Sequence, residues 1–221
     1  MILEVAMAGR VPYERALVWQ EALVARRQAG GVDALLLLEH PPVYTLGRGA
    51  DAVHLGAAAG GTVPVHRVAR GGEVTYHGPG QLVGYPIVGL ADLRPDLHWY
   101  LRTLEQVLVR ALADLGVSAD AVPGRTGVWV EGRRKIASIG IAVRRWVTWH
   151  GFALNVDADL AGFGAITPCG IPGVEMTSIR HEGGAADIAV VVAAVRDQFV
   201  ATLGYAGWRP LENAIEGTAW T

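Results

Sequence analysis

The chain has 221 residues, of which 51% are hydrophobic and 18% charged, and its formal net charge is −2. A chain of this length and hydrophobic content buries a substantial core, which excludes an intrinsically disordered protein and predicts a single domain over residues 1–221. The near-neutral charge and the absence of a long basic run argue against a nucleic-acid partner.

Three features predict a cytoplasmic protein. Cys169 is the only cysteine, so no intrachain disulfide can form, as is usual in a reducing compartment. The first residues include Glu4 and lack the basic and apolar segments of a signal peptide. The longest apolar run, residues 188–195, is far shorter than the ~20 residues that cross a bilayer. We therefore expect a soluble protein without a membrane partner.

The first third of the chain alternates between helix, strand and loop. Pro12 opens a helix whose apolar residues recur at helical spacing toward Gly30. Residues 33–38 form an apolar run typical of a buried strand, and the His-Pro-Pro sequence that follows ends it. We expect a loop at residues 44–49 and a further strand at residues 63–68.

The remainder of the chain predicts more strands and two helices. Leucines repeat every three to four positions over residues 97–115, and a second helix is expected from the capping residue Asp187 to Leu203. The expected strands cover residues 82–88, 127–130, 136–143 and 147–156. Strand hairpins combined with helices predict an α+β fold built on a β-sheet.

The most distinctive segment runs from Arg70 to Gln81 and contains four glycines, a proline and His77. Glycines allow positive φ and close approach of a ligand, and successive N–H groups in such turns bind anions. The segment is neither a P-loop nor a dinucleotide-binding G-x-G-x-x-G motif. Its spacing alone fits a tight turn between strands, but its polar residues beside apolar strand sequence favour a binding loop.

Two residues carry chemistry that no other side chain of the chain duplicates. Lys135 is the only lysine among 19 basic residues, and Cys169 lies between a proline and a glycine in an expected loop. A nucleophilic cysteine needs a neighbour that favours its thiolate, and His77, His150 and Lys135 are the candidates. The histidines show no metal-ligand spacing, so we predict no metal site.

The Arg70–Gln81 segment resembles the signature of the octanoyltransferases, also called lipoyl(octanoyl) transferases, of protein lipoylation. Four further segments agree with this family, at residues 39–48, 134–140, 150–156 and 167–171, the last with Thr177-Ser178. The resemblance extends over residues 35–203.

The resemblance implies a mixed β-sheet flanked by helices, similar to the catalytic domain of biotin and lipoate protein ligases. It implies an acyltransferase that moves an octanoyl group from octanoyl-acyl carrier protein to a lysine of a lipoyl domain, the first step of endogenous protein lipoylation. The implied acceptors are lipoyl domains of 2-oxoacid dehydrogenase subunits and the glycine cleavage H protein. No cofactor is expected, because thioester exchange is nearly thermoneutral and transfer from thioester to amide is downhill.

The same resemblance implies roles for individual residues. Cys169 is expected to carry the acyl group as a thioester, and Lys135 to favour its thiolate and shuttle protons. The residues expected to bind the acyl chain and its carbonyl are Arg70, Gly71, Gly72, Glu73, Val74, Thr75, Tyr76, His77, Ser138, Ile139, Gly140, Gly151, Phe152 and Ala153. Participation of His77 or His150 in proton transfer is left open.

Two alternative functions are compatible with parts of the sequence. An ATP-dependent lipoate protein ligase fits the implied fold, but the chain has no second lysine for adenylate chemistry and Cys169 would have no role. A non-catalytic acyl- or lipoyl-binding module would need neither Cys169 nor Lys135.

Docking of acidic partners onto a slightly acidic chain requires a local basic surface. We expect this surface at two hairpin turns, taken to be adjacent, that carry Arg133, Arg134, Arg144 and Arg145.

Overall fold

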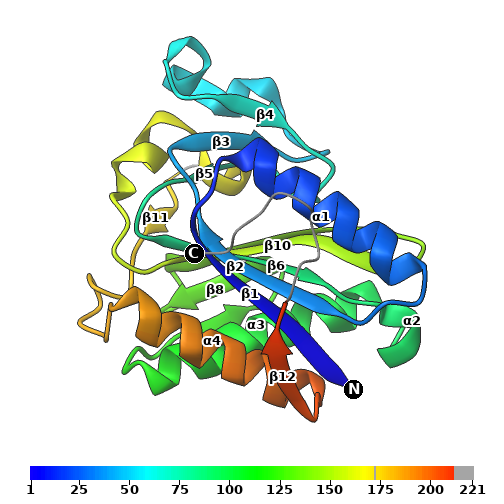
Figure 1. Cartoon of the computed structure of the whole chain (residues 1–221). Coiled ribbons are helices and arrows are strands. Elements are labelled where there is room, and N and C mark those ends of the chain that lie inside the picture. Colours follow the sequence, from blue (N-terminus) through cyan, green and yellow to red (C-terminus); the bar gives the residue numbers. More distant parts are fainter. Residues whose placement is uncertain (172, 212–221) are drawn as a thin grey trace.

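A large β-sheet with helices on both faces organises the chain, and a smaller sheet lies beside it (Figure 1). The computed structural model describes residues 1–171 and 173–211. Within those residues, the large sheet has nine strands and the small sheet has three.

The large sheet contains both parallel and antiparallel pairs. Its order is β12 (Gly207–Pro210), β1 (Ile2–Arg10), β2 (Ala34–Glu39), β6 (Gln81–Ile87), β10 (Val147–Asn155), β9 (Arg134–Arg144), β8 (Arg125–Val130) and β7 (Asp120–Val122), while β11 (Glu175–Met176) pairs with β9. Strand β1 is parallel to β12 and β2. Along the rest of this order, from β2 through β6, β10, β9 and β8 to β7, each strand pairs antiparallel with the next. The predicted mixed sheet with flanking helices is confirmed.

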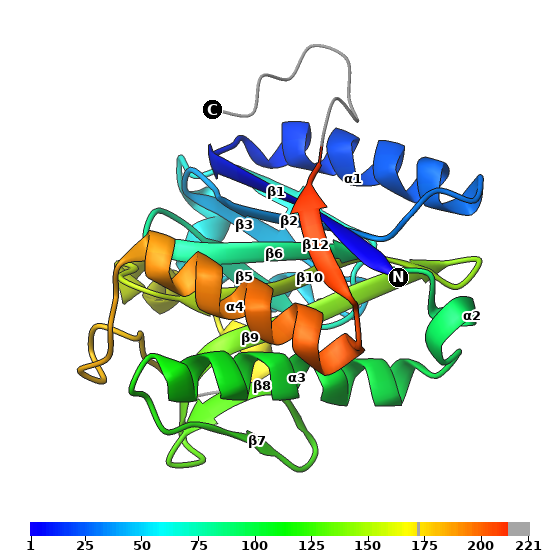
Figure 2. The same ribbon diagram turned by 60° about the horizontal axis from the view of Figure 1, so that its bottom comes forward.

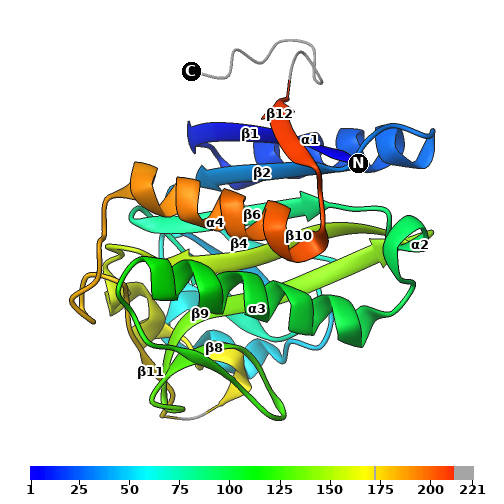
Figure 3. The same cartoon turned by 90° about the horizontal axis from the view of Figure 1, so that it is seen from below.

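The apolar run in β2 shows why the sheet is covered on both faces. Successive side chains of a strand point to opposite faces. Leu35 and Leu37 pack in the core under α3 (Leu97–Asp114) and α4 (Ile188–Leu203). Leu36 and Leu38 pack on the opposite face with α1 (Tyr13–Gln28). Figures 2 and 3 show α1 on one side of the sheet and α3 with α4 on the other.

The expected helices form with the expected boundaries because their end signals are local. The Asp96 carboxylate caps α3 by accepting a hydrogen bond from the backbone N–H of Trp99 at 3.0 Å. Asp187 caps α4 in the same way, and Gly204 ends that helix with a φ of 75°. A short helix, α2 (Leu90–Leu93), was not predicted. Among the helices of the described residues, none has the length and apolar character to cross a bilayer.

The small sheet corrects two expectations about loops. It consists of β4 (Val65–Arg67), β3 (Val43–Leu46) and β5 (Val74–His77). Strand β3 occupies the first half of the expected loop at 44–49, and β5 lies inside the glycine-rich segment. Both strands contain β-branched and aromatic residues that pair across the sheet, Tyr44 with Tyr76 and Thr45 with Thr75.

The two turns of the expected basic patch are not adjacent, because they lie at opposite ends of β9. This strand has 11 residues, and a strand of that length spans about 35 Å. Arg133 precedes β9 and Arg134 is its first residue, and both pair with carboxylates, Arg133 with Glu131 at 3.1 Å and Arg134 with Glu182 at 2.9 Å. Arg144 and Arg145 lie at the far end.

Candidate active site

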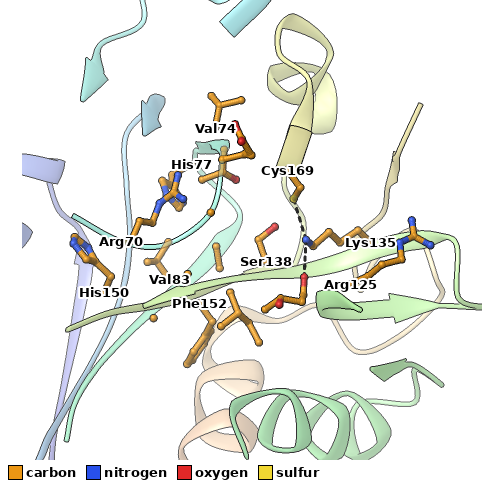
Figure 4. Close-up of a pocket in the computed structure, with 18 of the residues that line it drawn as sticks. Arg70, Val74, His77, Val83, Arg125, Lys135, Ser138, His150, Phe152 and Cys169 are labelled. Carbon is orange, nitrogen blue, oxygen red and sulfur yellow. Dashed lines mark hydrogen bonds between the residues drawn. The ribbon is translucent and has the colours of Figure 1, made fainter. Parts of the chain in front are cut away.

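Strand β9 places Lys135 in the interior of the protein. Only 3% of this residue is exposed, and its Nζ donates hydrogen bonds to the Thr126 carbonyl oxygen at 3.0 Å and to the Cys169 Sγ at 2.9 Å. The ammonium also lies 5.0 Å from the centre of the Trp129 ring, within cation–π range. The sulfur is therefore the partner of a buried cation (Figure 4).

A glycine in β8 makes room for the lysine side chain. Gly127 has a φ of 122°, and a Cβ built there would lie 2.5 Å from the Ala137 carbonyl oxygen and 2.7 Å from Lys135 Cε. No side chain fits at those distances. The path of Lys135 toward Cys169 thus depends on the missing side chain at position 127.

Cys169 is presented by a strained turn, the single-turn helix η3 (Pro168–Gly170). Its φ is 59° and that of Gly170 is 66°, and a non-glycine residue at positive φ costs about 1–3 kcal/mol. The segment is tied down on both sides. Thr167 donates its backbone N–H to the His54 carbonyl oxygen at 2.8 Å, and Thr177 donates to the Lys135 carbonyl oxygen at 3.0 Å.

A contact between the predicted site residue Glu73 and His54, which was not predicted, packs against this turn. His54 Nδ1 lies 3.0 Å from Glu73 Oε2. A Cβ added to Gly170 would approach Glu73 Cγ at 3.0 Å and His54 Cε1 at 3.2 Å. The pair therefore supports the cysteine turn. No spacing pattern links His54 to Cys169, which lies more than one hundred residues later in the chain.

Cys169 and Lys135 open onto a pocket of about 250 Å³. The predicted residues that line it are Arg70, Gly72, Glu73, Val74, Thr75, His77, Ser138, Ile139, Gly140, Gly151, Phe152 and Ala153. These residues come from three separate segments of the chain. The pairing of β9 with β10 aligns two of the segments, because Ser138 lies opposite Ala153.

Gly71 and Tyr76 were also predicted to bind substrate, and they do not line the pocket. Gly71 donates its backbone N–H to the Ile141 carbonyl oxygen at 2.8 Å, which fastens the segment to β9. Tyr76 points to the opposite side of β5, where it packs against Tyr44 and Phe163. Alternation along β5 puts Tyr76 on the face opposite Thr75 and His77, which line the pocket.

Arg70 anchors the glycine-rich segment from inside. Its Nη2 donates to the Thr45 carbonyl oxygen at 2.7 Å and to Thr45 Oγ1 at 2.8 Å, and its Nη1 donates to the Gly71 carbonyl oxygen at 3.0 Å. Burial lowers the pKa of this guanidinium, and the nearby Tyr13 and Cys169 partly oppose that effect. The buried cation adds positive potential to the pocket.

Two buried histidines, His77 and His150, line the pocket away from Cys169, and His40 lies next to His77, with ring centroids 5.8 Å apart. Burial lowers the pKa of His40 to about 4 and the pKa values of His77 and His150 to about 3. The positive charge of Arg70 contributes to the last two. All three rings are therefore neutral near pH 7. Lys135 is the candidate that contacts Cys169; no hydrogen bond joins His77 or His150 to the sulfur in the described part of the chain.

Other lining residues were missed for identifiable reasons. Tyr13 begins α1 and was taken as ordinary core packing, although it lines the pocket. Trp129 and Tyr85 also line it and lie in segments whose pattern indicated strands only, and Arg125 lines it from just before an expected strand. Among the described residues, no group of three or more His, Cys, Asp or Glu side chains is placed to hold a metal ion.

The model of the lipoyl protein ligase A/B catalytic domain matches residues 12–203. The chain therefore belongs to the lipoyl protein ligase A/B catalytic domain family. Within this family, a protein of Gloeobacter violaceus named "Octanoyltransferase" is 61% identical over 165 residues, which is 74% of this chain and 73% of that protein. The predictions of an octanoyltransferase family member and of an acyltransferase are confirmed.

Solved structures support the fold at low sequence identity. A lipoate-protein ligase A bound with ATP superimposes with a TM-score of 0.77 at 19% identity and covers 97% of this chain and 91% of that chain. A biotin protein ligase from Aquifex aeolicus in complex with biotin and ATP gives a TM-score of 0.55 at 12% identity, covering 91% and 70%. The predicted similarity to the biotin and lipoate ligase domains is confirmed.

The buried neutral histidines predict a stability that falls in mild acid. The pKa of His150 is about 3 in the folded protein and about 6.5 in an unfolded chain. Between these values the unfolded state binds more protons, so stability is lost as the pH falls below about 6.5. The variant His150→Asn keeps a residue that tolerates positive φ and removes this titration.

We expect urea denaturation to show that the free energy of unfolding of His150→Asn, relative to that of the wild type, increases by about 1 kcal/mol for each pH unit that the pH falls from about pH 6 to pH 4. Groups shared by both proteins cancel in this difference. A difference that stays constant over the range would contradict the burial of a neutral imidazole.

Proposed function

We propose that this chain transfers an octanoyl group from octanoyl-acyl carrier protein to a lysine of a lipoyl domain, through a thioester on Cys169. The contact of 2.9 Å between Lys135 Nζ and Cys169 Sγ at the mouth of a pocket carries the proposal. The name of the relatives supports the octanoyl group, and the family supports the lipoyl domain. The lipoyl domains of 2-oxoacid dehydrogenases and the glycine cleavage H protein are the proposed acceptors, in the cytoplasm.

In the first half-reaction, the Cys169 sulfur attacks the thioester carbonyl of the donor. An adjacent ammonium stabilises a thiolate relative to a thiol, so Lys135 prepares the nucleophile. A new bond joins the acyl carbon to Sγ, and the bond to the sulfur of the carrier breaks. Lys135 gives its proton to the departing carrier thiolate and is left neutral.

In the second half-reaction, the neutral Lys135 acts as the base. The incoming lysine has a reference pKa of about 10.4, and its neutral amine must lose a further proton as the amide bond forms. Lys135 accepts that proton, the bond between the acyl carbon and Sγ breaks, and the ammonium again faces a thiolate. The two half-reactions return the site to its starting state.

The pocket contacts favour the transferase over a lipoate ligase and over a non-catalytic module. The only lysine of the chain is directed at the only cysteine, and a ligase reaction would leave this pair without a role. A binding module would have no need to keep Cys169 in a turn with positive φ.

Acylation of the cysteine tests the proposed function directly. After incubation with octanoyl-acyl carrier protein, we expect intact-protein mass spectrometry to find one octanoyl group on Cys169 of the wild type and none on Cys169→Ala. Transfer to a lipoyl domain should also be lost in the variant, by at least about a thousandfold, because the route needs a sulfur nucleophile.

Two controls separate the alternatives. A lipoate ligase would modify the lipoyl domain only with a free acid and ATP, and a binding module would retain the acyl group without a covalent bond. Transfer by Cys169→Ala near the wild-type rate would exclude the thioester route.

Substitution of the lysine distinguishes its charge from its proton transfer. We expect Lys135→Arg to retain part of the acylation step but to lose transfer to the lipoyl domain by about 100-fold, since an arginine does not give up its proton. Lys135→Met, which removes the charge, should lose both steps. Single-turnover measurement of each half-reaction decides this. Equal and small losses in Lys135→Arg would leave Lys135 as a charge partner only.

Arg125 is a candidate docking cation at the pocket itself. It lines the mouth of the pocket with its guanidinium 4.0 Å from the centre of the Trp129 ring, and its Nη1 donates to the Gly132 carbonyl oxygen at 3.1 Å. In the part of the chain that the structure describes, no carboxylate pairs with it. We propose that it meets an anionic group of the acyl carrier protein.

A pair of matched variants tests this contact. We expect Arg125→Gln to raise the KM for octanoyl-acyl carrier protein by about 3–10-fold and to reduce its dependence on salt. Arg145→Gln removes an exposed charge at the far end of β9 and should change the KM by less than about twofold. A larger effect of Arg145→Gln would move the docking surface to that end.

A further inference from the structure

The acyl pocket ends in polar side chains. Cys169 and Lys135 lie at one side of the pocket, and His150 and Arg70 lie at the other (Figure 4). Between them, Val83, Ile139 and Phe152 contribute an apolar lining. An acyl chain attached to the cysteine would therefore run across apolar side chains and point its far end toward His150.

His150 is buried and has no hydrogen-bond partner for its ring. Only 1% of the residue is exposed, and neither Nδ1 nor Nε2 bonds to any described residue. A neutral imidazole carries one donor and one acceptor. Leaving a buried polar group unpaired is costly and calls for an explanation in a native site.

The neighbouring polar groups are already used, which singles out His150. The Tyr85 hydroxyl lies 2.7 Å from His40 Nε2, and His40 Nδ1 lies 2.6 Å from the Val11 carbonyl oxygen. His77 Nδ1 lies 2.8 Å from Gln81 Oε1. The remaining cation, Arg70, donates to Thr45 and Gly71.

The backbone holds the ring of His150 in this position. Its φ is 55°, a strained value for a residue with a side chain. Its backbone N–H donates to Oε1 of the fully buried Gln20 at 2.8 Å. The imidazole stacks on the Trp149 ring, with centroids 4.4 Å apart. A strained residue with a buried partner for its backbone and none for its ring indicates a functional constraint on the ring.

The position of His150 matches the length of an octanoyl group. His150 pairs with Ile141 of β9, three residues beyond the lining residue Ser138, and three residues of a strand span about 10 Å. With C–C bonds of about 1.5 Å in a zigzag, an extended eight-carbon chain spans roughly 9 Å. An octanoyl chain whose first carbons lie beside Ser138 would therefore bring its eighth carbon to the vicinity of the imidazole.

We propose that His150 forms a hydrogen-bonding subsite at the closed end of the acyl pocket, which stops saturated chains at about eight carbons and accepts a polar atom at the far end of the acyl group. This inference rests on the proposed octanoyl transfer. A longer saturated chain would press methylene groups onto unpaired ring nitrogens, whereas a terminal hydroxyl would satisfy them.

Two acyl groups with the same number of heavy atoms test the subsite in the wild-type enzyme. Nonanoyl and 8-hydroxyoctanoyl groups differ only in a terminal methyl or hydroxyl. With each group loaded on acyl carrier protein, we expect the kcat/KM for the hydroxylated group to be about 10-fold higher than for nonanoyl, because its hydroxyl can bond to the ring of His150. An apolar pocket end would instead favour nonanoyl by a similar factor. Faster transfer of nonanoyl would overturn the proposal.

A variant tests the proposed limit on the length of saturated acyl chains. His150→Gly tolerates the positive φ and removes the ring. We expect it to raise the kcat/KM for decanoyl relative to octanoyl by about 10-fold. Leu36→Ala is the control, because Leu36 is buried beside Tyr85 in the same core but does not line the pocket. An equal rise in Leu36→Ala would show a loosened core instead.

Transfer of octanoyl by the wild type distinguishes a failure of the proposed function from a failure of the proposed His150 subsite. If the wild type does not transfer octanoyl, the proposed function fails. The subsite can then still be tested by letting nonanoic acid and 8-hydroxyoctanoic acid compete for binding to the wild-type protein, which needs no transfer and no variant. Stronger binding of nonanoic acid would overturn the proposed subsite.

Discussion

The contact between the Lys135 ammonium and the Cys169 sulfur is the constraint on which the site depends. A buried cation needs a partner, and among the described residues its hydrogen-bond partners are this sulfur and the Thr126 carbonyl oxygen. The fold brings the cysteine to it by returning the chain after the turn to β9, where Met176 pairs with Lys135. The lysine thus lies in a rigid strand and the nucleophile in a turn fixed against that strand.

Much of the fold was predictable because its signals are local. The caps at Asp96 and Asp187, the leucine repeat of α3 and the apolar run of β2 each lie within one element. The strands β1 and β12 were not predicted, since their pairing joins the two ends of the described chain. In β5, the flanking glycines concealed a short strand that is defined by its pairing with β3.

The candidate site was predictable where a residue type was unique or a motif was long. Lys135 and Cys169 stood out as the only residues of their types, and the glycine-rich segment resembled a family. His54 and Tyr13 were missed because their place beside the pocket comes from packing between distant segments. Tyr76 shows the converse, since membership of a motif does not determine which face of a strand a residue occupies.

The position of the cysteine at the mouth of a pocket whose far end is buried has a kinetic consequence. The acyl group would enter and leave past Cys169, on the side where Arg125 lies. Carrier and acceptor proteins must then occupy the same surface in alternation, because both present their reacting group to one sulfur. Under the proposed function the enzyme is a ping-pong catalyst, in which an excess of either protein obstructs the other.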